Sequence, residues 1–305
     1  MLVSRIHLRL FAAAVVLLAA GWLGLRAAAQ SPSFLPGVQK NYRPDSVSDC
    51  SAIQQAIDNL PASGGVVLVT GSYLCQAPVV IARDQVELRG EGPSATLRLA
   101  DGANSPLLII GDTATPPARH HQMTVRNLVL DGNRAHQSLE CWGGPCDSGG
   151  LTFIRNNGLT VRGVEDVLVE NLGIFSARSG GLVAEKNVRR LTVRGLEASD
   201  NQFDGLAAYQ TEDSLFTELF LHDNPFAGLS LDIAFNRNVI SAAILADNGK
   251  QGIFMRDSRD NLFQGVQIRN SGEMGLFLAQ AEGGPATAAT GNTFAGLVVS
   301  NSAQM

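Results

Sequence analysis

Four polar side chains in the second half of the chain recur at a nearly constant interval. Two are acids, one is a phenol and one is a guanidinium, and successive members lie 24, 23 and 24 residues apart: Glu185, Tyr209, Asp232 and Arg256. A guanidinium can pair with a carboxylate of a ligand, while an acid or a phenol can accept or donate a proton. Their types and spacing make these four the candidate catalytic residues.

The interval comes from an internal repeat over residues 181–280. A glycine followed by Leu or Ile marks each copy, and the candidates stand four positions after the first four of these glycines: Gly181, Gly205, Gly228, Gly252 and Gly275. Apolar residues around each glycine are spaced by two, which is typical of strands, and polar turn residues precede it. One copy cannot bury its apolar side chains alone, so the copies must stack with parallel strands. The sequence predicts an all-β fold, a right-handed parallel β-helix with coils of 23–24 residues.

The start of the chain does not follow the repeat. Residues 1–29 combine a basic start, an apolar run and three small residues that end at Ala29, which predicts a signal peptide cleaved after that residue. An uncleaved membrane anchor is the alternative, but the apolar run is short for a bilayer span. We therefore expect a secreted or periplasmic protein with no membrane contact beyond this segment.

The remaining chain is predicted to form one domain. Residues 30–44 contain three prolines and predict an extended leader, and residues 45–305 the β-helix. Within it, residues 45–63 predict a short helix that covers the first coil, because an open solenoid end exposes apolar core and unpaired strand edges. The chain ends where the next Gly-Leu strand is due, so the C-terminal coil is expected to be incomplete.

The charge and the cysteines limit the class of partner and the compartment. Without residues 1–29, 20 basic side chains face 28 acidic ones, a net charge near −8 that argues against a nucleic-acid partner but allows a polysaccharide. Four cysteines in an exported chain favour two disulfides. Of three connectivities we expect nearest neighbours, Cys50–Cys75 and Cys141–Cys146. The alternative, a metal site at the second pair, has the wrong spacing for a zinc knuckle.

The candidate column suits chemistry at a uronate unit. It points outward, because side chains alternate along a strand and the apolar ones point inward. Such chemistry must neutralise the carboxylate, remove the C5 proton, and deliver a proton to O4 or to the opposite face of C5. Arg256 would pair with the carboxylate, and Tyr209 would act as acid or base once a nearby cation lowers its pKa from about 10. Glu185 and Asp232 form a candidate Ca²⁺ site, and no other cofactor is expected.

Three further side chains are candidates for substrate binding. Trp142 lies in an excursion from the repeat at residues 133–149, where it would either stack on a sugar ring or pack the loop onto the barrel. Phe254 belongs to an outward apolar column two positions before the candidate column. His222 belongs to a separate outward series of polar residues on another strand.

Other interpretations of the column stay open. It can be a solvated surface on which Asp232 pairs with Arg256. In a glycoside hydrolase, Glu185 and Asp232 would be an acid and a base about 9.6 Å apart across two coils. In a non-catalytic glycan-binding or cell-surface protein, the column would lie on a flat face. For an enzyme, the excursions at 133–149 and 281–289 should wall the column.

Two stretches resemble a known family. "DCSAIQQAIDNLPASGGVVLVTGSYLCQAPVVIARDQVELRGEG" at 49–92 and "VRNLVLDGNRAHQ" at 125–137 resemble the opening of the pectate lyase/rhamnogalacturonase superfamily, with Thr70 where that family usually has proline. The later repeats resemble parallel β-helix proteins that include the mannuronan C5-epimerases. The resemblance covers roughly residues 45–301 and implies a secreted right-handed β-helix that acts on carbohydrate.

The resemblance does not carry catalytic residues with it. The polygalacturonase-type signatures N-T-D, D-D and G-H-G are absent from this sequence, and so is the epimerase signature Y-G-F-D-P-H. The expected function is therefore an exported protein that acts on an acidic polysaccharide by lyase or C5-epimerase chemistry, with residue roles that rest on the column alone.

Overall fold

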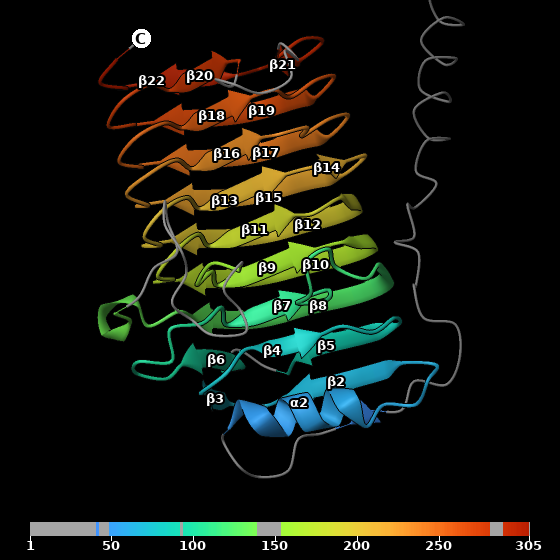
Figure 1. Cartoon of the computed structure of the whole chain (residues 1–305). Coiled ribbons are helices and arrows are strands. Elements are labelled where there is room, and N and C mark those ends of the chain that lie inside the picture. Colours follow the sequence, from blue (N-terminus) through green and yellow to red (C-terminus); the bar gives the residue numbers. More distant parts are fainter. Residues whose placement is uncertain (1–40, 43–48, 92–93, 139–153, 281–288, 305) are drawn as a thin grey trace, which may run out of the picture. The chain divides into compact units, whose positions relative to one another are not determined.

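The computed structural model describes residues 41–42, 49–91, 94–138, 154–280 and 289–304, which belong to one compact unit. Its strands form two parallel sheets wound into a stack of coils (Figure 1). The predicted all-β fold and its parallel β-helix architecture are confirmed. The signal peptide at 1–29 lies outside the described residues, as does all of the leader at 30–44 except 41–42.

Sheet A is the larger sheet and its strands follow one another from coil to coil. It contains β1 (Asn41–Tyr42), β2 (Gly65–Val69), β3 (Ser72–Cys75), β5 (Val86–Gly90), β6 (Thr96–Leu99), β8 (His120–Asp131), β10 (Val164–Phe175), β12 (Val188–Ser199), β14 (Thr211–Glu212), β15 (Leu215–His222), β17 (Val239–Ala246), β19 (Leu262–Arg269), β21 (Thr293–Ala295) and β22 (Val298–Ser300). A short 3-10 helix, η1 (Arg134–His136), follows β8.

Sheet B contributes one short strand to each coil. It contains β4 (Val79–Ile81), β7 (Leu108–Ile110), β9 (Leu159–Arg162), β11 (Leu182–Glu185), β13 (Leu206–Tyr209), β16 (Leu229–Asp232), β18 (Ile253–Arg256) and β20 (Leu276–Ala279). Leu182 pairs with Leu206 in register, and Leu206 with Leu229, so equivalent positions of the repeat lie directly above one another. The candidate column therefore runs along the carboxyl ends of the strands of sheet B.

Long strands in sheet A carry a bend. In each of them two strand segments join into one strand that turns at a residue with positive φ. These residues occupy one column: Asn127, Asn171, Gly195, Glu218, Ala242 and Gly265. The left-handed conformation turns the backbone, and the pairing with the coils on either side skips this residue and resumes at the next one.

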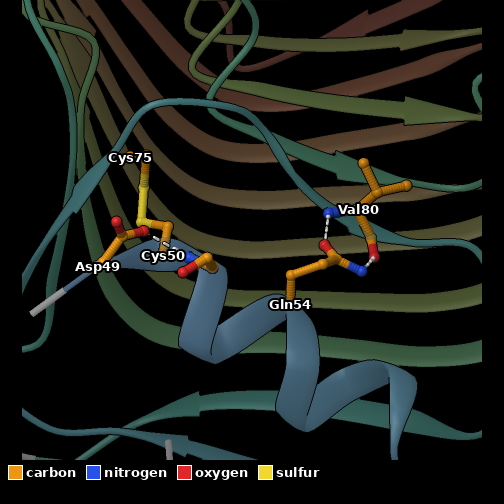
Figure 2. Close-up of a disulfide and its surroundings, with 6 residues drawn as sticks. Asp49, Cys50, Gln54, Cys75 and Val80 are labelled. Carbon is orange, nitrogen blue, oxygen red and sulfur yellow. Dashed lines mark hydrogen bonds between the residues drawn. A yellow bond between two sulfur atoms is a disulfide. The ribbon is translucent and has the colours of Figure 1, made fainter. Parts of the chain in front are cut away.

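Helix α2 (Cys50–Asp58) caps the first coil, within the predicted 45–63. The Asp49 side chain accepts a hydrogen bond from the Ser51 backbone N–H at 2.7 Å and so begins the helix. Gln54 lies beside β4: its Nε2 donates to the Val80 carbonyl at 3.1 Å, and its Oε1 accepts from the Val80 N–H at 2.7 Å (Figure 2). One side chain thus satisfies backbone groups that an open strand edge would leave unpaired.

The predicted disulfide between Cys50 and Cys75 is confirmed, and it ties α2 to β3 (Figure 2). The second predicted pair, Cys141 and Cys146, lies outside the described residues. At the other end of the stack, Leu278 and Val298 of the last described coil are exposed. No helix among the described residues is long and apolar enough to cross a membrane.

A ladder of buried asparagines stands behind the repeat glycines. The Asn201 Nδ2 donates to Asn224 Oδ1 at 3.1 Å, and Asn224 Nδ2 donates to Asn248 Oδ1 at 3.1 Å. A Cβ on Gly205 would lie 2.9 Å from Asn224 Nδ2, and one on Gly228 would lie 2.9 Å from Asn248 Nδ2. These two positions therefore require glycine, because they approach the ladder too closely for any side chain.

We expect Asn224→Ala to lower the free energy of unfolding by about 2–5 kcal/mol, because it leaves buried donors and acceptors of two neighbouring coils without partners. Denaturant unfolding followed by circular dichroism measures the change. Gln267→Ala, on the exposed face of β19, is the matched control and should change the free energy by less than about 0.5 kcal/mol. Equal effects of the two substitutions would show that the ladder does not stabilise the stack.

Candidate active site

The column of candidate residues lines a cleft of about 300 Å³ on the outer face of sheet B. Glu185, Tyr209, Asp232 and Arg256 all contribute to its wall, and Tyr209 pairs in register with Asp232. Val183 and Ala207 of the neighbouring outward column also line it, as expected of an apolar floor. The structure thus brings the four predicted residues together in a hollow, which a flat solvated face would not provide.

Asp232 and Arg256 form an ion pair at one end of the cleft. Asp232 Oδ2 accepts hydrogen bonds from Arg256 Nε at 3.1 Å and from Nη2 at 2.5 Å, and Oδ1 accepts from the Ile233 N–H at 2.8 Å. Asp232 is 3% exposed, whereas the Arg256 side chain is 35% exposed. The pair therefore holds its carboxylate inside the protein and leaves part of the guanidinium at the cleft.

Glu185 pairs with an arginine that lies below the cleft. Its Oε1 is 3.4 Å from Nε of Arg162, the residue it faces on β9. Arg162 is completely buried, while Glu185 lines the cleft. Burial raises the pKa of Glu185, and the charge of Arg162 opposes that rise.

Asp204, which precedes β13, adds an acid to the same cleft. Burial raises its pKa to about 6, although a hydrogen bond from the Ala227 N–H at 2.9 Å favours the charged form. The negative charge of Asp204 acts on Tyr209. Burial, and after it this charge, raises the pKa of Tyr209 to about 12. The Ser230 side chain opposes the rise in the pKa of both groups, so it lies near the acid and the phenol.

These values correct one expectation about Tyr209. We predicted that a nearby cation would lower its pKa below 10, but burial and Asp204 outweigh the opposing charge of Arg155. Tyr209 therefore stays protonated at neutral pH and is suited to donate a proton. Asp204, with a pKa near neutrality, is suited to accept one.

The candidate Ca²⁺ site at Glu185 and Asp232 fits that ion poorly. Calcium takes six to eight oxygen ligands. Here each of the two carboxylates faces an arginine, and Asp232 Oδ2 already accepts two hydrogen bonds from Arg256. Among the described residues there is no cluster of three or more His, Cys, Asp and Glu side chains that could hold a metal.

Two of the predicted substrate-binding residues do not line the cleft. Phe254 stacks on Phe277 with ring centroids 5.2 Å apart, and the Arg256 guanidinium lies 5.0 Å from the centre of its ring. Phe254 is only partly buried, and its ring packs against Phe277 and Arg256. His222 lies on β15 of sheet A, where Asp223 Oδ2 is 2.6 Å from its Nδ1. Trp142 lies outside the described residues.

Comparison with known proteins places the chain in a family. The model of the family described as "Right handed beta helix region" matches residues 123–303, more than half of the chain. The chain belongs to the right-handed β-helix family. This result confirms the predicted resemblance and the handedness of the coils.

Relatives within this family show how far the similarity extends. Mannuronan C5-epimerase AlgE4 of Azotobacter vinelandii is 29% identical over 199 residues, which are 61% of this chain and 34% of the relative. The chain thus spans about a third of that protein. Among solved structures, the A-module of the same epimerase matches with a TM-score of 0.50 at 17% identity, over 87% of this chain and 96% of the module.

A second solved structure is a hydrolase. The endo-xylogalacturonan hydrolase of Aspergillus tubingensis has a TM-score of 0.58 at 13% identity, over 87% of this chain and 76% of that enzyme. At this identity the likeness shows the fold alone. Right-handed β-helices with different activities on carbohydrate thus share this architecture.

Three charged residues in or beneath this cleft were missed by the reasoning from sequence. Arg162 stands four positions after the Gly158-Leu159 pair, which lies 23 residues before Gly181, so extending the repeat by one coil would have found it. Asp204 precedes a repeat glycine, where no column of polar residues exists. Arg155 lies two positions after the undescribed residues 139–153 and lines the cleft; most of the excursion predicted at 133–149 and of the one predicted at 281–289 lies outside the described residues.

The raised pKa of Asp204 makes a prediction about stability. Its folded-state pKa of about 6 lies above the ordinary 3.8, so this carboxyl stabilises the fold while protonated, and the contribution is lost as pH rises from about 4 through 6. Asp204→Asn should therefore raise the free energy of unfolding by about 1–3 kcal/mol at pH 8 relative to the unsubstituted protein, and by much less at pH 4.

Thermal or denaturant unfolding between pH 4 and 8 tests this expectation. Asp260→Asn, at an exposed turn, is the control and should change stability equally at both pH values. If the effect of Asp204→Asn did not depend on pH, the assignment of a raised pKa to Asp204 would be wrong.

Proposed function

We propose that this protein transfers the C5 proton of uronate units in an acidic polysaccharide, as a lyase or a C5-epimerase. The observation that carries the proposal is the pair Asp204 and Tyr209, which line one cleft, lie near the same serine, Ser230, and have pKa values of about 6 and about 12. Two groups whose environments drive their pKa values apart are suited to the separate roles of base and acid.

Positive charge in the cleft supports a uronate substrate. Arg155 and Arg256 both line it, and a guanidinium pairs with a carboxylate through parallel hydrogen bonds. Neutralising the carboxylate makes the adjacent C5–H more acidic, because the negative charge that develops at C5 is shared with the carboxylate. The partly exposed guanidinium of Arg256, fixed by Asp232, is the group suited to this role.

In the proposed reaction, the Asp204 carboxylate takes the C5 proton and the pair of electrons stays on the substrate. In an epimerase, Tyr209 gives its proton to the opposite face of C5. In a lyase, the electrons form the C4–C5 double bond, the C4–O4 bond breaks, and Tyr209 protonates O4. The proton on Asp204 then returns to the tyrosinate through Ser230, and both groups regain their starting states.

The relatives support this choice among carbohydrate reactions. AlgE4 is named a mannuronan C5-epimerase, and its similarity covers 61% of this chain. The cleft also favours proton transfer over hydrolysis by Glu185 and Asp232, because Asp232 is held in an ion pair with Arg256 and is not available as acid or base.

We expect the purified protein to act on at least one polyuronate among pectate, alginate and hyaluronan, with neutral glycans as negative controls and Ca²⁺ added or chelated. Absorbance near 235 nm reports a lyase, and exchange of the C5 proton in D₂O reports an epimerase. Tyr209→Phe and Asp204→Asn should each lower the rate by about 10²-fold or more, because each removes one proton-transfer group.

His222→Gln is the matched control for these variants. Because His222 lies on sheet A and does not line the cleft, this variant should keep the rate within about twofold. New reducing ends without absorbance would indicate a hydrolase instead. Binding of a polyuronate without any reaction would indicate a glycan-binding β-helix, and loss of activity in His222→Gln would place the site elsewhere.

We also propose that the protein is exported, as residues 1–29 predict. The Cys50–Cys75 disulfide supports this proposal, because such bonds persist in oxidising compartments. Expression of the full chain should give a secreted or periplasmic product that begins at Gln30, and the intact mass of the product measures this. A cytoplasmic product that retains residues 1–29 would contradict it.

A further inference from the structure

We propose that Arg162 is a positioning residue for the cleft. It lies behind the cleft wall and holds Glu185 in place. The inference rests on the proposed function only in that Glu185 lines the cleft in which the reaction is proposed. The contacts of the two side chains are by themselves the reason to infer that Arg162 fixes the Glu185 carboxylate.

Arg162 is held by groups outside the cleft. Its Nη1 donates to the Thr113 carbonyl at 2.9 Å, and its Nη2 donates to the Thr115 hydroxyl at 3.3 Å. These partners belong to the segment between β7 and β8. The guanidinium therefore cannot swing into the cleft without breaking both hydrogen bonds.

The segment that holds Arg162 is itself ordered by an acid. Asp112 accepts hydrogen bonds from the Ala114 N–H at 3.1 Å and from the Ala118 N–H at 2.9 Å. Those bonds lower the pKa of Asp112, to which the charges of His120 and Arg162 also contribute. Asp112 thus fixes the turn that presents Thr113 and Thr115 to the guanidinium.

Arg162 and Glu185 meet without a hydrogen bond of good geometry. Arg162 Nε and Glu185 Oε1 lie 3.4 Å apart, and each is a buried atom with no hydrogen-bond partner. Two such atoms in a wall that is otherwise well paired need an explanation. Opposite charge joins the two side chains here, and the guanidinium, fixed on its other side by Thr113 and Thr115, sets where the carboxylate lies.

Of the positive charges around Glu185, that of Arg162 has the largest effect on its pKa. Burial raises the pKa of Glu185, and Arg162, Lys186 and Arg155 oppose it in that order. Arg162 is buried, whereas Lys186 is partly exposed and follows Glu185 in the chain. Arg162 is thus the charge that most opposes the rise in the pKa of this carboxyl.

The position of Arg162 in the repeat strengthens the inference. It occupies the position in its coil that Glu185, Tyr209, Asp232 and Arg256 occupy in the next four, but it alone of the five is fully covered. The column therefore extends one coil beyond the cleft, to a buried arginine that faces Glu185 on the neighbouring strand.

The test compares Arg162→Met with Lys186→Gln in full-length protein. The Glu185 carboxyl is followed by ¹³C NMR over a pH titration, and Glu185→Gln assigns its signal. We expect Arg162→Met to raise the pKa of Glu185 clearly more than Lys186→Gln does, because a buried charge is screened less than one near solvent. A pKa of Glu185 that Arg162→Met leaves unchanged, or moves no more than Lys186→Gln does, would overturn the proposal.

Arg162→Lys covers the case in which Arg162→Met does not fold. It keeps the charge but cannot reach Thr113 and Thr115 together, so it should lower kcat on the polyuronate that the screen identifies by about tenfold, with KM within about twofold. Wild-type kcat in Arg162→Lys would contradict a positioning role. The NMR result needs no substrate, so a shifted pKa of Glu185 in a protein inactive on every polyuronate would reject the proposed function and leave the positioning of Glu185 supported.

Discussion

The tight approach of one coil to the next at the repeat glycine is the constraint on which this structure depends. At that point the glycine lies against the buried asparagine ladder, where even a methyl group would collide. Each asparagine bonds to the coil on either side of it, so the ladder fixes the distance and the register between coils. With the register fixed, equivalent residues of successive coils must lie above one another.

The cleft follows from that register. A column of polar side chains on sheet B becomes a line of groups about one strand spacing apart, and each group lies in the field of its neighbours. Partial burial then strengthens every interaction among them, because fewer waters screen the charges. For this reason Asp232 is held by Arg256 and Glu185 by Arg162, while Asp204 and Tyr209 have pKa values moved upward by burial.

The arrangement also separates support from chemistry. The side chains of Asp232 and Glu185 each face an arginine. Asp204 and Tyr209 instead both lie near Ser230, and burial raises their pKa values to about 6 and about 12. A site with this division can hold a carboxylate and move a proton at the same time.

The amino-acid sequence by itself determined the architecture, because the spacing of Gly205, Gly228 and their equivalents repeats in every coil and strand periodicity is local. It also predicted α2 and the Cys50–Cys75 bond, which join segments close in sequence, and it placed the four members of the column in one line. Only the tertiary structure decided that the line is a cleft, that Asp204 belongs to it, and that Phe254 and His222 do not. Those facts depend on burial by side chains from other coils, and so does the direction in which the pKa of Tyr209 moves. A pattern of spacing records where residues recur but not how much solvent remains around them.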